Sequence, residues 1–192
     1  MRQVWPYEEW KDIEIGKMRE AFIKRSRTSP RLGDIKVIDL CCLACNNVSP
    51  VGIYVFTRDA DILYVGKTHG RSLQERMISH VDNRKPSKGS PHLASLVSTL
   101  VKSGGSSDES DAVFHILNMK VTWLPVPTER LAPDLLKKSI AVIERRLLWQ
   151  ECLDPTYNST RVKRNNSFTV KGKRYHLSEV DAVGELVKNE TI

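Results

Sequence analysis

Six side chains able to take part in chemistry occur along the chain in the order Tyr54, Tyr64, Arg76, His80, Glu144 and Asn158. Tyrosine and histidine can transfer protons, arginine can bind anions, and glutamate can bind cations. The tyrosines lie in Gly52-Ile53-Tyr54 and Tyr64-Val65-Gly66. A strand tyrosine is most often a packing residue, but a neighbouring glycine lets a ligand or another backbone approach closely. The two motifs therefore predict a site as well as a fold.

Glu144 is unusual on physical grounds. It lies at the edge of an apolar stripe that Ile140, Ile143 and Leu147 form at helical spacing. A lone charge in such a place costs desolvation free energy unless it is paired or bound to a metal. Two explanations stay open, a metal ligand and a salt bridge with Arg76.

Short elements must bring these residues together. The alternating patterns at 52–57 and 62–66 predict a hairpin that places the two tyrosines near each other. Ser72 and Glu75 have capping-box spacing, which predicts a helix at 72–82. Arg76 and His80 are four residues apart and would share one face of this helix.

Elsewhere we expect helices at 7–25, 91–102 and 133–152, strands at 35–40 and 112–123, a polar loop at 103–111, a hairpin at 168–177 and a helix cap at 178–181. Asn158 follows the long helix in a turn, where its amide could tie the chain end back to the sheet.

The bulk composition fits one domain with additions at both ends. The chain has 192 residues, of which 40% are hydrophobic, enough for one core. No apolar run reaches the roughly 20 residues that span a bilayer, and no secretory signal opens the chain, so we expect a soluble, intracellular (cytoplasmic) protein. The net charge of +7 favours a polyanionic partner but does not separate nucleic acid from an anionic membrane.

The cysteines indicate no function. Cys42 and Cys45 have the spacing of half a zinc site or of a redox pair, but no second close pair of cysteines or histidines completes it. Whether they bind metal stays open.

The ordered set of six residues resembles the GIY-YIG nuclease family, and the segment from about 51 to 158 is similar to a complete domain of that family. The resemblance implies an α+β sandwich with a small, mainly antiparallel three-stranded sheet flanked by helices. The chain then divides into a helical N-terminal extension (1–50), a nuclease-like domain (51–160) and a basic C-terminal extension (161–192). Arg71 and Arg76 both come after the second motif, and Arg76 is favoured as the family's arginine because it shares a helix face with His80.

Family members hydrolyse DNA phosphodiesters with one divalent metal, so the resemblance implies a metal-dependent endodeoxyribonuclease. Glu144 would hold Mg²⁺ or Mn²⁺, and Arg76 would bind the non-bridging phosphate oxygens. Tyr54 would be the general base, provided that Arg76, Lys67 and the metal lower its pKa. Which tyrosine is the base stays open.

The resemblance gives the remaining residues supporting roles. Tyr64 and His80 would orient the water or the phosphate, and Asn158 would hold the site together. The stretch from 161 to 174 has six Lys or Arg residues and no acidic one, which beside a nuclease domain predicts contacts to the DNA backbone. The expected contacts to double-stranded DNA are Lys67, Arg71, Arg161, Lys163, Arg164, Lys171, Lys173 and Arg174.

Three functions compete. The first is an active endonuclease, either site-specific and restriction-like or belonging to structure-specific repair or to a mobile element. A palindromic target would imply a homodimer. The second is a DNA-binding module without catalysis, and the third is a basic scaffold that binds no nucleic acid, which would leave the order of the motifs unexplained.

Overall fold

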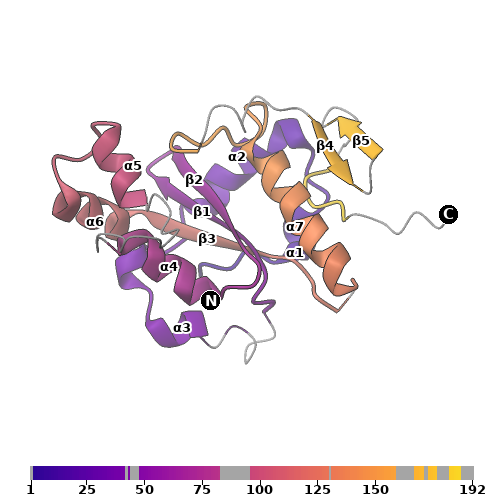
Figure 1. The fold of residues 1–192 in the computed structure, drawn as a ribbon, viewed down its shortest axis with the longest axis horizontal. Coiled ribbons are helices and arrows are strands. Elements are labelled where there is room, and N and C mark those ends of the chain that lie inside the picture. The colour runs from indigo at the N-terminus through magenta and orange to yellow at the C-terminus, as the bar shows by residue number, and fades with distance from the viewer. Residues whose placement is uncertain are drawn as a thin grey trace, which may run out of the picture.

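An antiparallel sheet in the strand order β2-β1-β3 lies between two layers of helices (Figure 1). The structure, a computed structural model, describes residues 2–41, 43, 48–82, 96–129, 131–158, 167–170, 173–176 and 182–186. The strands are β1 (Gly52–Arg58), β2 (Asp61–Thr68) and β3 (Lys120–Pro125), and a separate hairpin is formed by β4 (Ser167–Val170) and β5 (Lys173–His176). The helices are α1 (Tyr7–Trp10), α2 (Ile15–Ser26), the 3₁₀ turn η1 (Leu32–Asp34), α3 (Val37–Cys41), α4 (Leu73–Val81), α5 (Leu96–Lys102), α6 (Glu109–Asn118) and α7 (Pro133–Leu148). The predicted α+β sandwich is confirmed.

The alternation of side chains along β1 gives the protein two cores. Ile53 and Val55 pack with α2 and α7 on one face of the sheet. Tyr54 and Phe56 pack with α4, α5 and α6 on the other face. Both faces of the central strand are buried, so the sheet is fixed from both sides.

The β1–β2 hairpin is confirmed close to its predicted bounds. It turns at Asp59, which has a φ of 55°, a left-handed value that aspartate tolerates better than most residues. Gly52, at the start of β1, lies against β3, and a Cβ there would be 2.2 Å from the carbonyl oxygen of Leu124. The first motif glycine therefore allows β1 and β3 to pair.

The N-terminal segment packs on the sheet. The backbone N–H of Trp5 donates to the Trp123 carbonyl of β3 at 2.8 Å. Trp10, Met18 and Phe22 are fully buried in the core that α7 and β1 share. The expected N-terminal extension thus contributes to the same core as the expected nuclease-like domain.

Two predicted strands are wrong. Residues 35–40 do not form a strand, because 37–41 form helix α3, in which Leu40 is buried while Val37 and Ile38 are exposed. Residues 112–118 belong to helix α6, and the strand begins only at Lys120. Short apolar runs fit the periodicity of a helix as well as that of a strand, and both of these segments form helices.

Three other predicted bounds also change. The helix at 7–25 is interrupted between Trp10 and Ile15, giving α1 and α2. The long helix α7 ends at Leu148 rather than at 152, and the expected loop at 103–111 ends where α6 begins. Of the helix at 91–102, the described part runs from 96 to 102, and the cap at 178–181 lies outside the described residues.

Among the described residues, no helix is long and apolar enough to cross a membrane.

Candidate active site

The hairpin places the two motif tyrosines against each other. Tyr54 of β1 pairs with Gly66 of β2, and the ring centroids of Tyr54 and Tyr64 are 6.2 Å apart. A Cβ on Gly66 would lie 2.3 Å from Cζ of Tyr54 and 2.4 Å from its Oη. The Tyr54 ring therefore packs directly on the backbone of Gly66, where a side chain would leave no room for it.

Helix α4 brings His80 to these tyrosines. The predicted capping box starts the helix: Ser72 accepts from the Glu75 N–H, and the Glu75 carboxylate accepts from the Ser72 N–H. One side of α4 then carries His80 into the core, where its Nε2 is 2.7 Å from Oη of Tyr54. The His80 ring also meets the Tyr64 ring edge-on, with a centroid distance of 5.0 Å.

Arg76 lies one turn before His80 on α4 and is half-buried. Its charge acts on Tyr54, Tyr64 and His80. The Nε of Arg76 is buried and makes no hydrogen bond to any described residue. A buried donor without a partner is costly, which fits a side chain that binds an anion. Arg71, the other predicted arginine, is exposed and precedes the helix.

Glu144 pairs with a lysine. Its Oε2 is 2.5 Å from Nζ of Lys67, and its side chain keeps 19% of its accessible surface. The salt bridge with Arg76, one of the two explanations left open for Glu144, is not formed among the described residues, where Glu144 pairs with Lys67 instead. Lys67 pairs with Ile53 in the sheet and so faces α7, and this strand alternation was the sequence signal that we missed.

Asn158 ties the segment after α7 to β2, as predicted. Its Oδ1 accepts from the Val65 N–H at 2.8 Å, and its Nδ2 donates to the Val65 carbonyl at 2.9 Å. These two hydrogen bonds satisfy the backbone N–H and carbonyl of Val65 at the outer edge of β2, between Tyr64 and Gly66. Backbone bonds from Thr156 and Tyr157 to Ile62 and Leu63 continue the attachment.

The site has a neutral interior. Burial raises the pKa of Tyr54 well above 10.0, and interaction with Tyr64 raises it further, while Arg76 acts in the opposite direction. Burial also raises the pKa of Tyr64. Burial and the charge of Arg76 lower the pKa of His80 to about 4. Arg76 lowers the pKa of Tyr54, as expected, but in the protein alone the desolvation of the phenol outweighs this effect and the pKa is raised.

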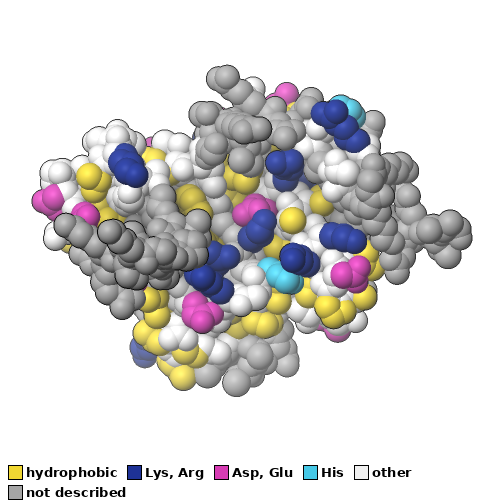
Figure 2. Space-filling model, in the orientation of Figure 1, with side chains coloured by type: hydrophobic (Ala, Val, Ile, Leu, Met, Phe, Trp, Pro, Cys, Tyr) yellow, Lys and Arg dark blue, Asp and Glu magenta, His cyan; other side chains and the backbone are white. Residues whose placement is uncertain are grey.

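The six predicted residues therefore meet at the β2 edge of the sheet. Tyr54, Tyr64, Arg76 and His80 come from the α4 side, whereas the Lys67–Glu144 pair comes from the α7 side. Figure 2 shows Lys and Arg side chains gathered across the middle of the molecular surface that faces the viewer, over α4 and α7.

The residues present fit a single hard cation. Glu144 offers one partly buried carboxylate, and Lys67 contacts only its Oε2. No group of three or more His, Cys, Asp or Glu side chains suited to a metal occurs in the part of the chain that the structure describes. Mg²⁺ is often held by one or two carboxylates with waters and substrate phosphate, so the single carboxylate of Glu144 suits it.

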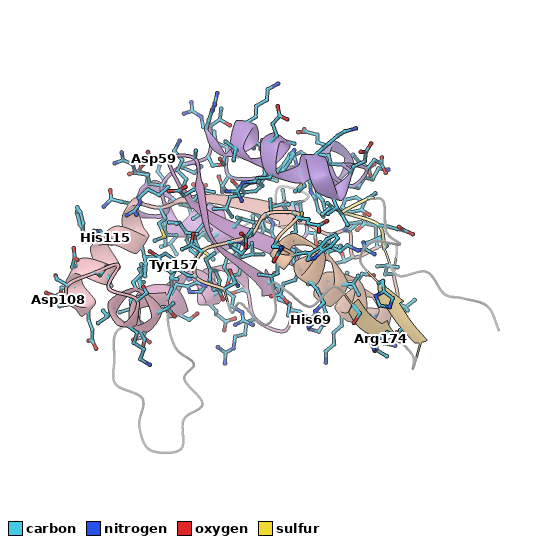
Figure 3. All side chains as sticks on the ribbon, turned by 90° about the horizontal axis from the view of Figure 1, so that it is seen from above. Asp59, His69, Asp108, His115, Tyr157 and Arg174 are labelled. Carbon is cyan, nitrogen blue, oxygen red and sulfur yellow. The ribbon has the colours of Figure 1, made fainter. Side chains whose placement is uncertain are left out.

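The predicted DNA contacts are only partly described. Lys67 lies in the site, Arg71 is exposed nearby, and Arg174 of β5 is exposed with its guanidinium on the Ser167 hydroxyl. In Figure 3, His69, which follows β2, and Arg174 lie on the same side of the molecule. The other expected contacts, Arg161, Lys163, Arg164, Lys171 and the Lys173 side chain, lie outside the described residues, as do Cys42 and Cys45.

Comparison of the chain with protein-family models, with curated proteins and with solved structures found no match.

Proposed function

We propose that this chain is a divalent-metal-dependent DNA endonuclease of the GIY-YIG type. One observation carries the proposal: residues chosen from the sequence for their chemistry come from two strands, two helices and a turn, and converge at one sheet edge. Packing alone requires neither an arginine with an unpartnered buried donor nor a partly buried carboxylate that acts on the same two tyrosines as that arginine.

Arg76 binds the scissile phosphate in this proposal. The fork of donors on its guanidinium matches two phosphate oxygens. The buried Nε without a partner is the donor that the phosphate would satisfy. Bonds of this kind strengthen as negative charge develops on the phosphate oxygens during cleavage.

Tyr54 and His80 move the proton of the attacking water. The neutral Tyr54 hydroxyl lies 2.7 Å from the neutral His80 Nε2, so it can donate to the imidazole while its oxygen accepts from water. As the water attacks phosphorus, its proton passes to the Tyr54 oxygen and the Tyr54 proton passes to His80. No free phenolate is needed at neutral pH, which suits a buried phenol.

Glu144 holds the Mg²⁺ or Mn²⁺ ion, which when bound neutralises charge on the phosphate and the leaving oxygen. Lys67 orients the carboxylate through their ion pair. Asn158 holds β2, and with it Tyr64, in place.

The test is cleavage of a supercoiled plasmid by the purified chain in Mg²⁺, in Mn²⁺ and in EDTA. We expect cutting with either metal and none in EDTA. Arg76→Gln should slow cutting by about 100-fold or more, because one transition-state donor is lost. Binding in every condition without cutting would favour the inactive DNA-binding module instead.

We propose further that cleavage is site-specific and restriction-like. The basic segments outside the site residues give the enzyme its own means of holding DNA. Sequencing of fragment ends tests this point: one recurrent sequence at the ends supports it, whereas ends at junctions, flaps or lesions would support a structure-specific nuclease.

A further inference from the structure

A basic hollow of about 720 Å³ lies apart from the candidate active site. Four cations and one carboxylate line it, namely Arg2, Arg27, Arg31, Lys120 and Asp34. Like charges gathered around one hollow repel each other, so the arrangement favours an anion.

The arginines of this basic hollow are available to a ligand. The guanidinium groups of Arg2 and Arg27 make no hydrogen bond or ion pair with any described residue, and all three arginines are exposed. Arg31 reaches Oδ1 of Asn118 only at 3.5 Å. Lys120 is fixed at the rim because its Nζ donates to the Arg27 carbonyl at 2.8 Å.

The basic hollow and the candidate active site lie at opposite edges of the sheet. Lys120 begins β3, whereas the site lies along β2, with β1 between them. Lys120 pairs with Thr57 in the sheet. Its side chain lies on the same face of the sheet as Thr122, and Tyr54 lies on the opposite face. In Figure 3, Asp59, two residues after Thr57, lies on the side of α2, and His69 lies on the opposite side.

The hollow suits several phosphates. Each guanidinium presents a fork of donors that matches phosphate oxygens. A volume of about 720 Å³ is many times that of a water molecule, roughly 30 Å³, so a single inorganic phosphate would fill little of it. A sugar-phosphate backbone, with charges at regular intervals, can meet three arginines at once.

A duplex bound at the candidate active site does not reach the hollow by bending. Double-stranded DNA is stiff, with a persistence length of about 150 base pairs, and turning it around the edge of a small domain is costly. We infer that the basic hollow binds the phosphate backbone of a second DNA duplex, so that one protein molecule bridges two DNA segments. The inference rests on the proposed function, since it takes DNA as the partner.

A bridging assay tests the inference. Bead-bound duplex is mixed with protein and a fluorescent second duplex in EDTA, and captured fluorescence is measured. The wild-type chain should capture the second duplex, and the double variant Arg27→Gln/Arg31→Gln should capture about tenfold less, since two phosphate contacts are lost. The same variant should cut a single duplex in Mg²⁺ at the wild-type rate, because neither arginine lies in the site.

The matched control is Lys17→Gln/Lys102→Gln, which removes the same charge from exposed positions outside the hollow. It should bridge like the wild type. Equal bridging by the arginine variant, or no bridging by a wild-type chain that cuts DNA, would overturn the inference and leave the proposed function standing. A wild-type chain that neither binds nor cuts DNA would overturn both.

Discussion

At the scale of single residues, Tyr54 and His80 act as one unit. The hydrogen bond between them is buried, and both groups are neutral at pH 7 because desolvation disfavours the phenolate and the imidazolium. In the proposed step this pair starts neutral, and a buried charge appears only when His80 accepts the proton as the water attacks. In the proposed nuclease, Arg76 and Glu144 would supply the charges that bind a phosphate and a cation.

Removing the hydroxyl of Tyr54 separates its role from that of Tyr64. We expect Tyr54→Phe to lower the cleavage rate by about 10² to 10⁴-fold, the usual contribution of a proton-transfer group. Leaving His80 Nε2 without its partner should also lower the free energy of unfolding by about 1–3 kcal/mol. Single-turnover cleavage and urea unfolding measure the two effects. If Tyr64→Phe slows cleavage more than Tyr54→Phe does, Tyr64 is the base.

The buried His80 predicts a pH-dependent stability. Its folded pKa of about 4 lies below the usual 6.5, so between these values the unfolded chain binds a proton that the folded chain does not. Stability is therefore lost as pH falls through this window. Urea unfolding should give a free energy about 2 kcal/mol lower at pH 5 than at pH 7.5 from this residue. His80→Phe removes the titrating group, and an identical pH slope in that variant would contradict the assignment.

At the scale of elements, the sequence predicted best where a local rule and burial agreed. The hairpin, the capping box of α4 and the apolar stripe of α7 each have one clear period or cap, and all are confirmed. Helix α6 was missed because Val113 to Leu117 alternates in character. The overlooked signal was Asp108, whose side chain accepts from the Asp111 N–H and caps the helix.

The site was predictable in its members but not in its pairings. Asn158 binds the strand as expected from its turn. The partner of Glu144 depends on which face of β2 carries Lys67, and that register is fixed only by the pairing with β1. The high pKa of Tyr54 likewise depends on tertiary burial, which the residue types alone do not contain.

Gly66 tests the contact between the strands. Gly66→Ala should push the Tyr54 ring away from His80, because the new Cβ would be 2.3 Å from the ring. We expect cleavage to fall at least tenfold and the free energy of unfolding to fall by about 1–3 kcal/mol. The control is Gly16→Ala in α2, where a Cβ meets nothing within 4 Å, and this change should stabilise by up to about 1 kcal/mol. Full activity of Gly66→Ala would mean that the Tyr54 position is not needed.

At the scale of the whole molecule, the described C-terminal residues 182–186 are joined to the first helices and to α7. The Val183 and Gly184 N–H groups donate to the carbonyls of Ile13 and Lys11, both at 2.9 Å. Arg146 of α7 is buried, and its Nη1 donates to the carbonyls of Val183 and Glu185. The N-terminal segment, α7 and the C-terminal segment therefore close one core.

Arg146→Ala should loosen the attachment of the C-terminal segment 182–186 to α7. The lost donors leave the carbonyls of Val183 and Glu185 unpaired, the first of them in a buried residue, so we expect the free energy of unfolding to fall by about 3 kcal/mol. Hydrogen exchange should report faster exchange at the Val183 and Gly184 amides than in the wild type. Arg145→Ala, at a half-buried neighbouring position that contacts Ser167, is the matched control and should leave those amides protected. Unchanged protection in Arg146→Ala would show that the C-terminal segment is held by other contacts.

The proposed nuclease depends on Glu144 as its metal-binding carboxylate, and the rate of plasmid cleavage in Mg²⁺ by Glu144→Gln measures that dependence. The change keeps the shape of the side chain and removes its charge, so the rate should fall by at least about 100-fold. Glu151→Gln, which alters an exposed glutamate just after α7, should cut like the wild type. Cleavage by Glu144→Gln at the wild-type rate would show that Glu144 does not hold the metal of the cleaving site.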